Sequence, residues 1–179
     1  DPIEVAYARH DAQNLYLVYR KRIVPDRKGR RARIKAVTMG KDVPVWEDDA
    51  FEFFLSDGSS ENVIHLGIAA SGASYDSLLR FPPLPADPKQ AKAALKDSPE
   101  EDTQWNGEWD FKVLLEQDRF IVEMAIPWAT LKTLDIQLDD LRLNLHHVRS
   151  PYRRKPFSRQ SRRNSMQLNL SDTKPSPKP

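Results

Sequence analysis

The sequence predicts an all-β protein, an antiparallel β-sandwich of the jelly-roll or immunoglobulin-like type. Apolar and polar residues alternate with a period of two in at least seven short segments, which is the pattern of half-buried strands. Turn-forming residues separate these segments at regular spacing, as in sandwiches. The length of 179 residues suits one domain. We therefore expect a single sandwich over residues 1–170 and a disordered Lys/Pro/Ser tail over residues 171–179.

Each expected strand is bounded by residues that favour turns. Residues 11–14 have turn chemistry and would join the first two strands as a hairpin. Residues 56–60, which include Gly58, would end the third strand, and Pro127 would stop the sixth. The expected strands cover residues 3–7, 15–20, 51–55, 63–69, 109–115, 119–126, 141–148 and 166–170.

Residues 81–102 interrupt the alternation and are expected to form an insertion on the rim. Their prolines favour an extended start. Asp87 followed by Pro88 is typical of a helix N-cap and first helical position, so a short helix is expected over residues 89–95. A short turn is expected over residues 128–131, with Trp128 in the core.

The composition excludes several classes of site. There is no cysteine, which excludes disulfides, zinc–thiolate centres, iron–sulfur clusters and a thiol nucleophile. No apolar run reaches the roughly 18 residues that a membrane helix needs. The sequence shows no signal peptide.

Charges are segregated along the chain although the net charge is only +2. Residues 20–41 hold ten basic residues and one acid, and residues 142–179 hold the same numbers. Two basic loops, over residues 27–35 and 149–163, are therefore expected. They are either solvated loops or a face that binds an acidic glycan, a nucleic acid or an anionic membrane. A nucleic acid is not the expected partner, because no RNP strand or helix-turn-helix pattern accompanies the bases.

Four segments, in order, resemble the family 9 carbohydrate-binding modules. The segment over residues 45–55 contains Trp46, Asp49 and Glu52 and is similar to the family's Trp-x-x-Asp-x-x-Glu core followed by apolar residues. The other similar segments are residues 14–19, residues 122–131, and Leu143-Asn144 with Arg149; Trp105-Asn106-Gly107-Glu108-Trp109 also matches a common feature of bacterial members. The similarity covers residues 4 to about 150 and lacks the family's first strand, which suggests a trimmed chain or a piece of a longer protein.

The resemblance implies a non-catalytic module that binds a polysaccharide or oligosaccharide. An indole ring covers the apolar face of a pyranose, and carboxylates, amides and guanidinium groups bond its hydroxyl rim. Trp46 would be the stacking platform, Glu52 would accept hydroxyl bonds, and Asn144 and Arg149 would complete the rim. Members of the family that hold a sugar between two indole rings carry the second Trp after the strand that contains Asn144. This chain has no Trp there, so another aromatic residue would take that role: Trp105, Trp109 or Tyr152. Phe157 lies in the same loop as Tyr152.

The resemblance also implies structural calcium and a loop at the rim of the site. Asp48 or Asp49 could supply oxygen to a calcium ion, which prefers carboxylates and carbonyls; the alternative is that both are simple solvated acids. Tyr75-Asp76 resembles a family loop near the ligand. The family is secreted or surface-bound, which implies an extracellular or envelope location and other domains in a longer chain as partners.

Three other functions are weighed against glycan binding. Glycosidase chemistry would need two of the acids Glu47, Asp48, Glu52 and Glu123 at a suitable separation across a cleft, and we do not expect an enzyme. A DOMON-like domain of the same superfamily would hold haem b through methionine with histidine or lysine; the candidates are Met39, Met124, Met166 and His65. An interaction or scaffold domain would use the basic loops for a macromolecular partner.

Overall fold

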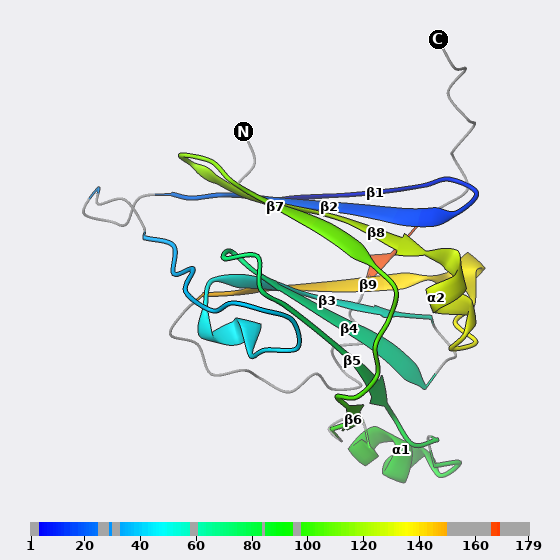
Figure 1. The fold of residues 1–179 in the computed structure, drawn as a ribbon. Helices are drawn as coiled ribbons and strands as arrows, with labels where there is room; N and C mark the ends of the chain where they lie inside the picture. The colour runs from blue at the N-terminus through cyan, green and yellow to red at the C-terminus, as the bar shows by residue number, and fades with distance from the viewer. Residues whose placement is uncertain are drawn as a thin grey trace.

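The structure, a computed structural model, describes residues 4–24, 29, 33–57, 61–83, 85–94, 98–149 and 166–168. Two antiparallel sheets lie face to face (Figure 1). The smaller sheet has the strand order β1-β2-β8-β7, and the larger has the order β10-β9-β3-β4-β5-β6. The predicted all-β sandwich is confirmed.

The strand boundaries follow the alternation of the sequence. The smaller sheet contains β1 (Glu4–His10), β2 (Asn14–Arg22), β7 (Asp110–Leu115) and β8 (Arg119–Pro127). The larger sheet contains β3 (Ala50–Ser56), β4 (Asn62–Ala69), β5 (Ser74–Arg80), β6 (Glu100–Asp102), β9 (Arg142–Val148) and β10 (Met166–Gln167).

Inward-facing side chains of both sheets form the main core. In β2, Leu15, Leu17 and Tyr19 are buried while the intervening Tyr16 is exposed, which is the period of two that the sequence shows. Phe51 of β3 stacks on Phe120 of β8 with ring centroids 4.3 Å apart. Each such buried side chain stabilises the fold by about 1.5–3 kcal/mol, and together they join the two sheets.

The expected hairpin at residues 11–14 is present, and its turn is closed by one side chain. Oδ1 of Asp11 accepts the backbone N–H groups of Gln13 and Asn14 at 2.7 and 2.8 Å. β1 and β2 then pair from His10 with Leu15 to Glu4 with Lys21. The aspartate forms this turn because its short side chain reaches backbone donors two and three residues ahead.

The expected rim helix is present, and the turn expected over residues 128–131 is a second short helix. Asp87 Oδ1 accepts the N–H groups of Lys89 and Gln90, which confirms the predicted N-cap of α1 (Pro88–Ala94). α2 (Trp128–Lys132) follows Pro127, and Trp128 packs half-buried against the main core. Among the described residues, none of the helices has the length and apolar character needed to cross a bilayer.

One expectation was wrong. Residues 74–80, which include Tyr75 and Asp76, were expected to contain a loop but form β5, which pairs with both β4 and β6. Its polar residues Ser74, Asp76 and Ser77 are buried, so the strand lacks the alternation by which the other strands were found. β6 lies within the expected insertion and was missed for a related reason, since its three residues are all acidic.

Candidate functional site

The face of the larger sheet that is turned away from the smaller sheet carries most of the predicted ligand residues. We call it the outer face. Across it, one row of paired positions joins Tyr75, Gly67, Glu52 and His146. The next row joins Ser77, His65, Phe54 and Asn144. Side chains of successive rows on one face are two residues apart along each strand, so the register brings Glu52 and Asn144 onto the same face.

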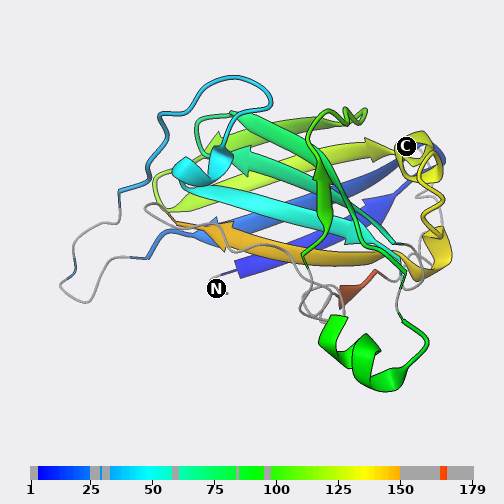
Figure 2. The same cartoon turned by 90° about the horizontal axis from the view of Figure 1, so that it is seen from below.

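A 3₁₀ turn, η1 (Val45–Glu47), covers one end of the outer face. Viewed from below, it lies in front of the larger sheet (Figure 2). Val45 is fully buried there with Ala50, Ala69 and Val148. The next residue, Trp46, is half-buried, and its ring meets the Tyr75 ring edge-on at 5.1 Å and 80°. Trp46 therefore lies at the rim of the outer face with part of its indole open to solvent.

Buried polar groups run across the middle of the outer face. His65 Nε2 lies 2.9 Å from Glu52 Oε1, and both side chains are buried. On the other side, the Ser77 hydroxyl is 3.4 Å from His65 Nδ1 and donates to Glu101 Oε1 at 2.8 Å. The Tyr75 hydroxyl donates to the same oxygen at 2.8 Å. This network satisfies groups whose burial would otherwise be costly.

Aromatic rings hold the network in place. The Phe54 ring stacks on the His65 ring, with centroids 4.4 Å apart and an angle of 9° between the planes. The Tyr75 ring contacts the same imidazole edge-on. Glu52 and Tyr75 were predicted from the sequence to lie at or near the ligand, whereas His65 was considered only as a haem ligand. The sequence could have indicated its position, because pairing β3 with β4 through the turn after Ser56 puts His65 opposite Phe54.

The predicted rim residues have different exposures. Asn144 and His146 are half-buried on β9, and Arg149 just beyond β9 is exposed. Burial lowers the pKa of His146, while the nearby Glu52 acts in the opposite direction. Tyr152 and Phe157 lie outside the described residues.

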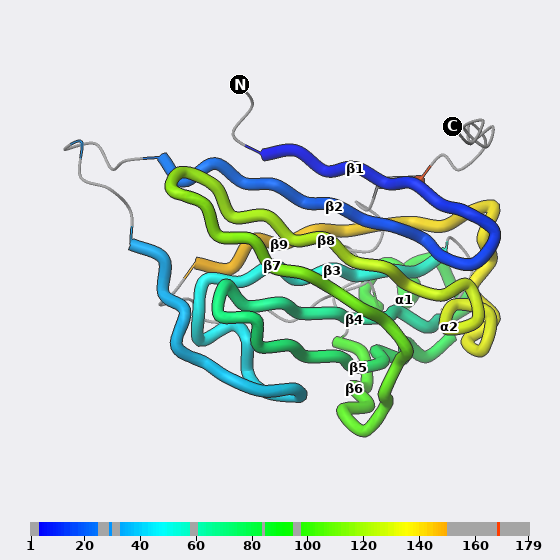
Figure 3. Tube along the Cα trace, turned by 45° about the horizontal axis from the view of Figure 1, so that its top comes forward, coloured from blue at the N-terminus to red at the C-terminus, as the bar shows by residue number. Residues whose placement is uncertain are grey.

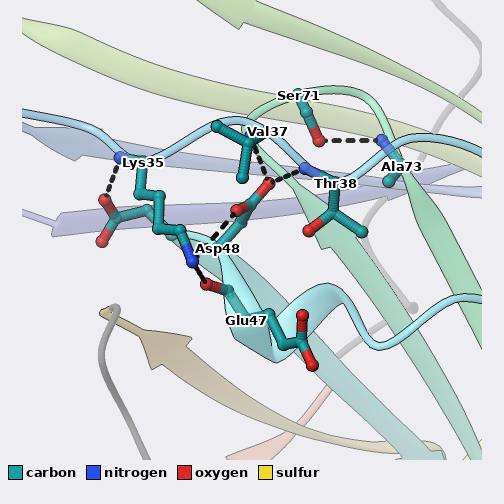
Figure 4. Close-up of polar contacts among 8 residues, drawn as sticks. Lys35, Val37, Thr38, Glu47, Asp48, Ser71 and Ala73 are labelled. Atoms are coloured by element: carbon teal, nitrogen blue, oxygen red, sulfur yellow. Dashed lines mark hydrogen bonds and ion pairs between the residues drawn. The ribbon is translucent and has the colours of Figure 1, made fainter.

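Asp48 fixes the segment that leads into η1 (Figure 4), and Asp49 does the same from the next position. Asp48 Oδ2 accepts the backbone N–H groups of Val37 and Thr38, each at 2.7 Å. Asp49 Oδ2 accepts the N–H of Lys35 at 2.7 Å. Neither side chain is a solvated acid, because both are buried. Their carboxylates hold an otherwise irregular stretch of backbone against the sheet.

The other carboxylate oxygen of Asp48 is the atom that could bind the expected calcium ion. Asp48 Oδ1 is buried without a hydrogen-bond partner among the described residues and lies 3.9 Å from Lys35 Nζ. Within the same part of the chain, no group of three acidic, histidine or cysteine side chains could hold a metal ion. The described residues therefore show an oxygen of Asp48 without a hydrogen-bond partner but no group of three ligands around it, and calcium at Asp48 stays a prediction.

Trp105 and Trp109 lie away from the outer face. Both are half-buried against the main core. The Trp105 ring covers Gly107 so closely that a Cβ there would lie 2.4 Å from the ring, and Trp109 stacks on Phe111 at 5.1 Å. The structure therefore does not bring these two indoles together with Trp46.

Asp76 is the buried acid that holds the 105–109 segment. Its side chain points to the inner side of β5, opposite to Tyr75, and its Oδ2 accepts the N–H of Gly107 at 2.9 Å. Burial raises the pKa of this carboxyl, and Lys41, whose Nζ is 3.8 Å from Oδ1, partly offsets that effect.

The residues of the alternative functions are dispersed. Met124 packs inside the main core, His65 faces outward from the other sheet, and Met39 is 75% exposed, so these three do not share a haem site. Glu123 is exposed on β8 in the smaller sheet, whereas Glu52 is on the outer face of the larger sheet. This pair therefore does not face a common cleft. The side chain of Met166 lies outside the described residues.

Comparisons with known proteins show a similarity in structure. No known protein family and no curated protein matches the sequence. A crystal structure from Bacteroides uniformis, described as a candidate carbohydrate-binding protein, superposes with a TM-score of 0.53 at 15% identity. The match covers 80% of this chain and 62% of that one, so the chain spans less than two thirds of its neighbour. At this identity the similarity establishes a shared fold.

Proposed function

We propose that the protein is a non-catalytic carbohydrate-binding module of the family 9 type. The observation that carries the proposal is the position of Trp46 at the rim of the outer face, with one part of its indole on Tyr75 and another open to solvent. An exposed indole beside a polar sheet face suits a pyranose, which has an apolar side and a hydroxyl rim. The fold shared with a candidate carbohydrate-binding protein supports it.

The burial of the outer face assigns different roles to the predicted residues. Trp46 and Asn144 are accessible enough to meet a saccharide, and His146 joins them. Arg149 is exposed but lies with His147 at the end of the sandwich, not on the outer face. Glu52 is buried and already bonded to His65, so its role in the proposal is to set the shape of the site. Tyr75 supports the Trp46 ring, in place of the missing clamp residue. Calcium and an extracellular or envelope location belong to the same proposal.

Glycan titration of matched variants tests the proposal. A glycan array identifies the saccharide, and calorimetry then compares the wild type with Trp46→Ala and Trp46→Phe. We expect Ala to weaken binding by roughly five- to 150-fold if the sugar stacks as strongly as a base does on an aromatic ring, on the order of 1–3 kcal/mol, and Phe to retain part of the affinity. Tyr7→Ala is the matched control, since Tyr7 is an exposed aromatic residue, 58% accessible, on β1 of the other sheet.

The same titration distinguishes glycan binding from the alternative function, an interaction domain with a macromolecular partner. Unchanged affinity in Trp46→Ala would remove the site from the outer face. No saccharide binding at all, together with a salt-sensitive macromolecular partner, would favour the interaction domain that the basic segments suggest.

A further inference from the structure

A cavity opens between the two sheets at the end of the sandwich opposite α2. There the end of β2, residues 33–34 and the end of β9 come together (Figures 1 and 3). Including its open mouth, the cavity holds about 430 Å³. We call it the end pocket. It is separate from the outer face, because Phe120 and His147, which line it, point into the space between the sheets.

The floor of the end pocket is apolar. Phe120 is buried at 2% exposure, and Ile23 and Ile34 are half-buried beside it. His147 lies against Phe51 at the inner end, and burial lowers its pKa to about 4. The imidazole is thus neutral at pH 7 and adds no charge to the floor.

The mouth of the end pocket is cationic. Arg22, Arg33 and Arg149 line it together with Lys21, while Asp49 is the acidic residue of the lining. Lys21 is paired with Glu4, and Asp49 is bonded to the backbone of Lys35. Within the described part of the chain, none of the three guanidinium groups forms an ion pair.

These three arginines come from the described ends of the two basic segments. Arg33 lies in the basic loop over residues 27–35, Arg22 precedes that loop, and Arg149 begins the loop over residues 149–163. The fold therefore brings Arg22 and Arg33 together with Arg149, which is more than 110 residues away in the sequence. Like charges repel when they are gathered, so an arrangement of this kind is stabilised by a bound anion. Guanidinium groups bind carboxylates in a two-pronged geometry that lysine does not provide.

We propose that the end pocket binds an organic carboxylate whose apolar body lies on Phe120 and Ile34 and whose carboxylate meets Arg33 and Arg149. The acid could come from two sources, an alkanoic acid or a uronic acid of a saccharide, and the shared chemistry is a carboxylate on a body with an apolar face. The proposal does not depend on glycan binding at Trp46.

Methyl NMR on the whole chain locates the binding. Protein labelled at isoleucine methyls is titrated with hexanoate, glucuronate, 1-hexanol and hexylamine. We expect at least one of the two acids to shift the methyl signals of Ile23 and Ile34 and leave that of Ile64, which is buried in the main core, unchanged. The alcohol and the amine should bind at least tenfold more weakly, and sodium chloride should weaken binding of the acid.

The two acids distinguish the sources. Hexanoate binding without glucuronate binding identifies an alkanoic acid, and glucuronate binding of comparable strength identifies a saccharide acid. Shifts from neither acid, or equal binding of 1-hexanol and hexanoate, would overturn the proposal.

Variants of the exposed arginines complete the test. Arg33→Gln and Arg149→Gln should each weaken binding about tenfold, as expected for a lost hydrogen bond to a charged group. Both residues are exposed, so the fold should tolerate the changes, and far-UV circular dichroism checks this. Arg9→Gln is the matched control, because Arg9 is exposed towards the other end of β1. Wild-type affinity in the Arg33/Arg149 double variant would also overturn the proposal.

Discussion

Val45 occupies the space that a side chain at Gly67 would fill. A Cβ at position 67 would lie 2.6 Å from Cγ2 of Val45 and 3.5 Å from Cβ of Tyr75. Because β4 has no side chain at position 67, η1 can lie directly on the outer face and hold Trp46 against Tyr75. The proposed stacking platform therefore depends on a missing side chain in a neighbouring strand.

Gly67→Ala should destabilise the protein by about 1–3 kcal/mol, because the added methyl group overpacks a closed contact. Urea unfolding measures the loss of free energy. If Trp46 is the saccharide platform, glycan affinity should fall as well. Val45→Ala in the same chain should recover part of the lost stability, and additive effects of the two substitutions would contradict the close contact.

The buried Glu52–His65 pair predicts a difference between two substitutions at one position. Glu52→Leu should cost about 3–5 kcal/mol, since it removes the partner of the buried His65 Nε2. Glu52→Gln should cost less because the amide oxygen can still accept a hydrogen bond. Urea unfolding compares the two. Equal stability of the Leu variant and the wild type would mean that the pair is not formed.

Asp48→Ala should release the backbone at residues 37 and 38. Both amide groups lose their acceptor, so their hydrogen exchange should approach that of exposed amides, while exchange in β8 should stay slow. Amide exchange measured by NMR gives this residue by residue. Protection that persists at both residues in the variant would show that something other than Asp48 holds the segment.

The calcium expectation is tested with the same residue. If calcium binds at Asp48, millimolar calcium chloride should raise the Tm of the wild type and leave that of Asp48→Asn unchanged. A shift of the same size in both proteins would place the ion elsewhere.

His147 predicts a pH dependence of stability whose sign follows from its pKa. The pKa is about 4 in the folded protein, against 6.5 ordinarily; burial is the main cause, Lys21 and Arg149 act in the same direction, and Glu4 opposes them. Between these values the unfolded chain binds more protons, so stability falls as pH decreases from 6.5 towards 4. After allowance for solvent screening, this contributes about 1–2 kcal/mol.

Comparison with His147→Gln isolates that effect from the other groups that titrate. The wild type should lose more stability than the variant between pH 7 and pH 4.5 in urea unfolding. Parallel pH profiles of the two proteins would show that His147 is not buried in its neutral form.

The alternation of the sequence was sufficient to predict the sandwich, because most strands bury one face and expose the other. β2, with Leu15, Leu17 and Tyr19 inward, is typical. β5 could not be predicted in this way, since Asp76 and Ser77 are buried by bonding to Gly107 and Glu101. Gly107 is 31 residues from Asp76 and Glu101 is 24 residues from Ser77, and nothing local in the sequence indicates these partners.

The candidate site could be predicted only in part, for a related reason. The spacing of Trp46 and Glu52 placed one before a strand and the other on it, and the structure agrees. The contacts that decide their exposure come from other strands, with Tyr75 beside Trp46 and His65 beside Glu52. The end pocket likewise depends on where the ends of β2 and β9 meet, although its charge was visible in the sequence.

The segment from Arg33 to Asp49 connects the two proposed binding regions. Ile34 lines the end pocket, Trp46 stands at the rim of the outer face, and the carboxylates of Asp48 and Asp49 tie the backbone at residues 35, 37 and 38 to the stretch that follows η1. A shift of Ile34 on ligand entry would thus be passed along the tethered chain towards the indole. Occupancy of one region would then alter affinity at the other, and by thermodynamic reciprocity the reverse would hold to the same degree.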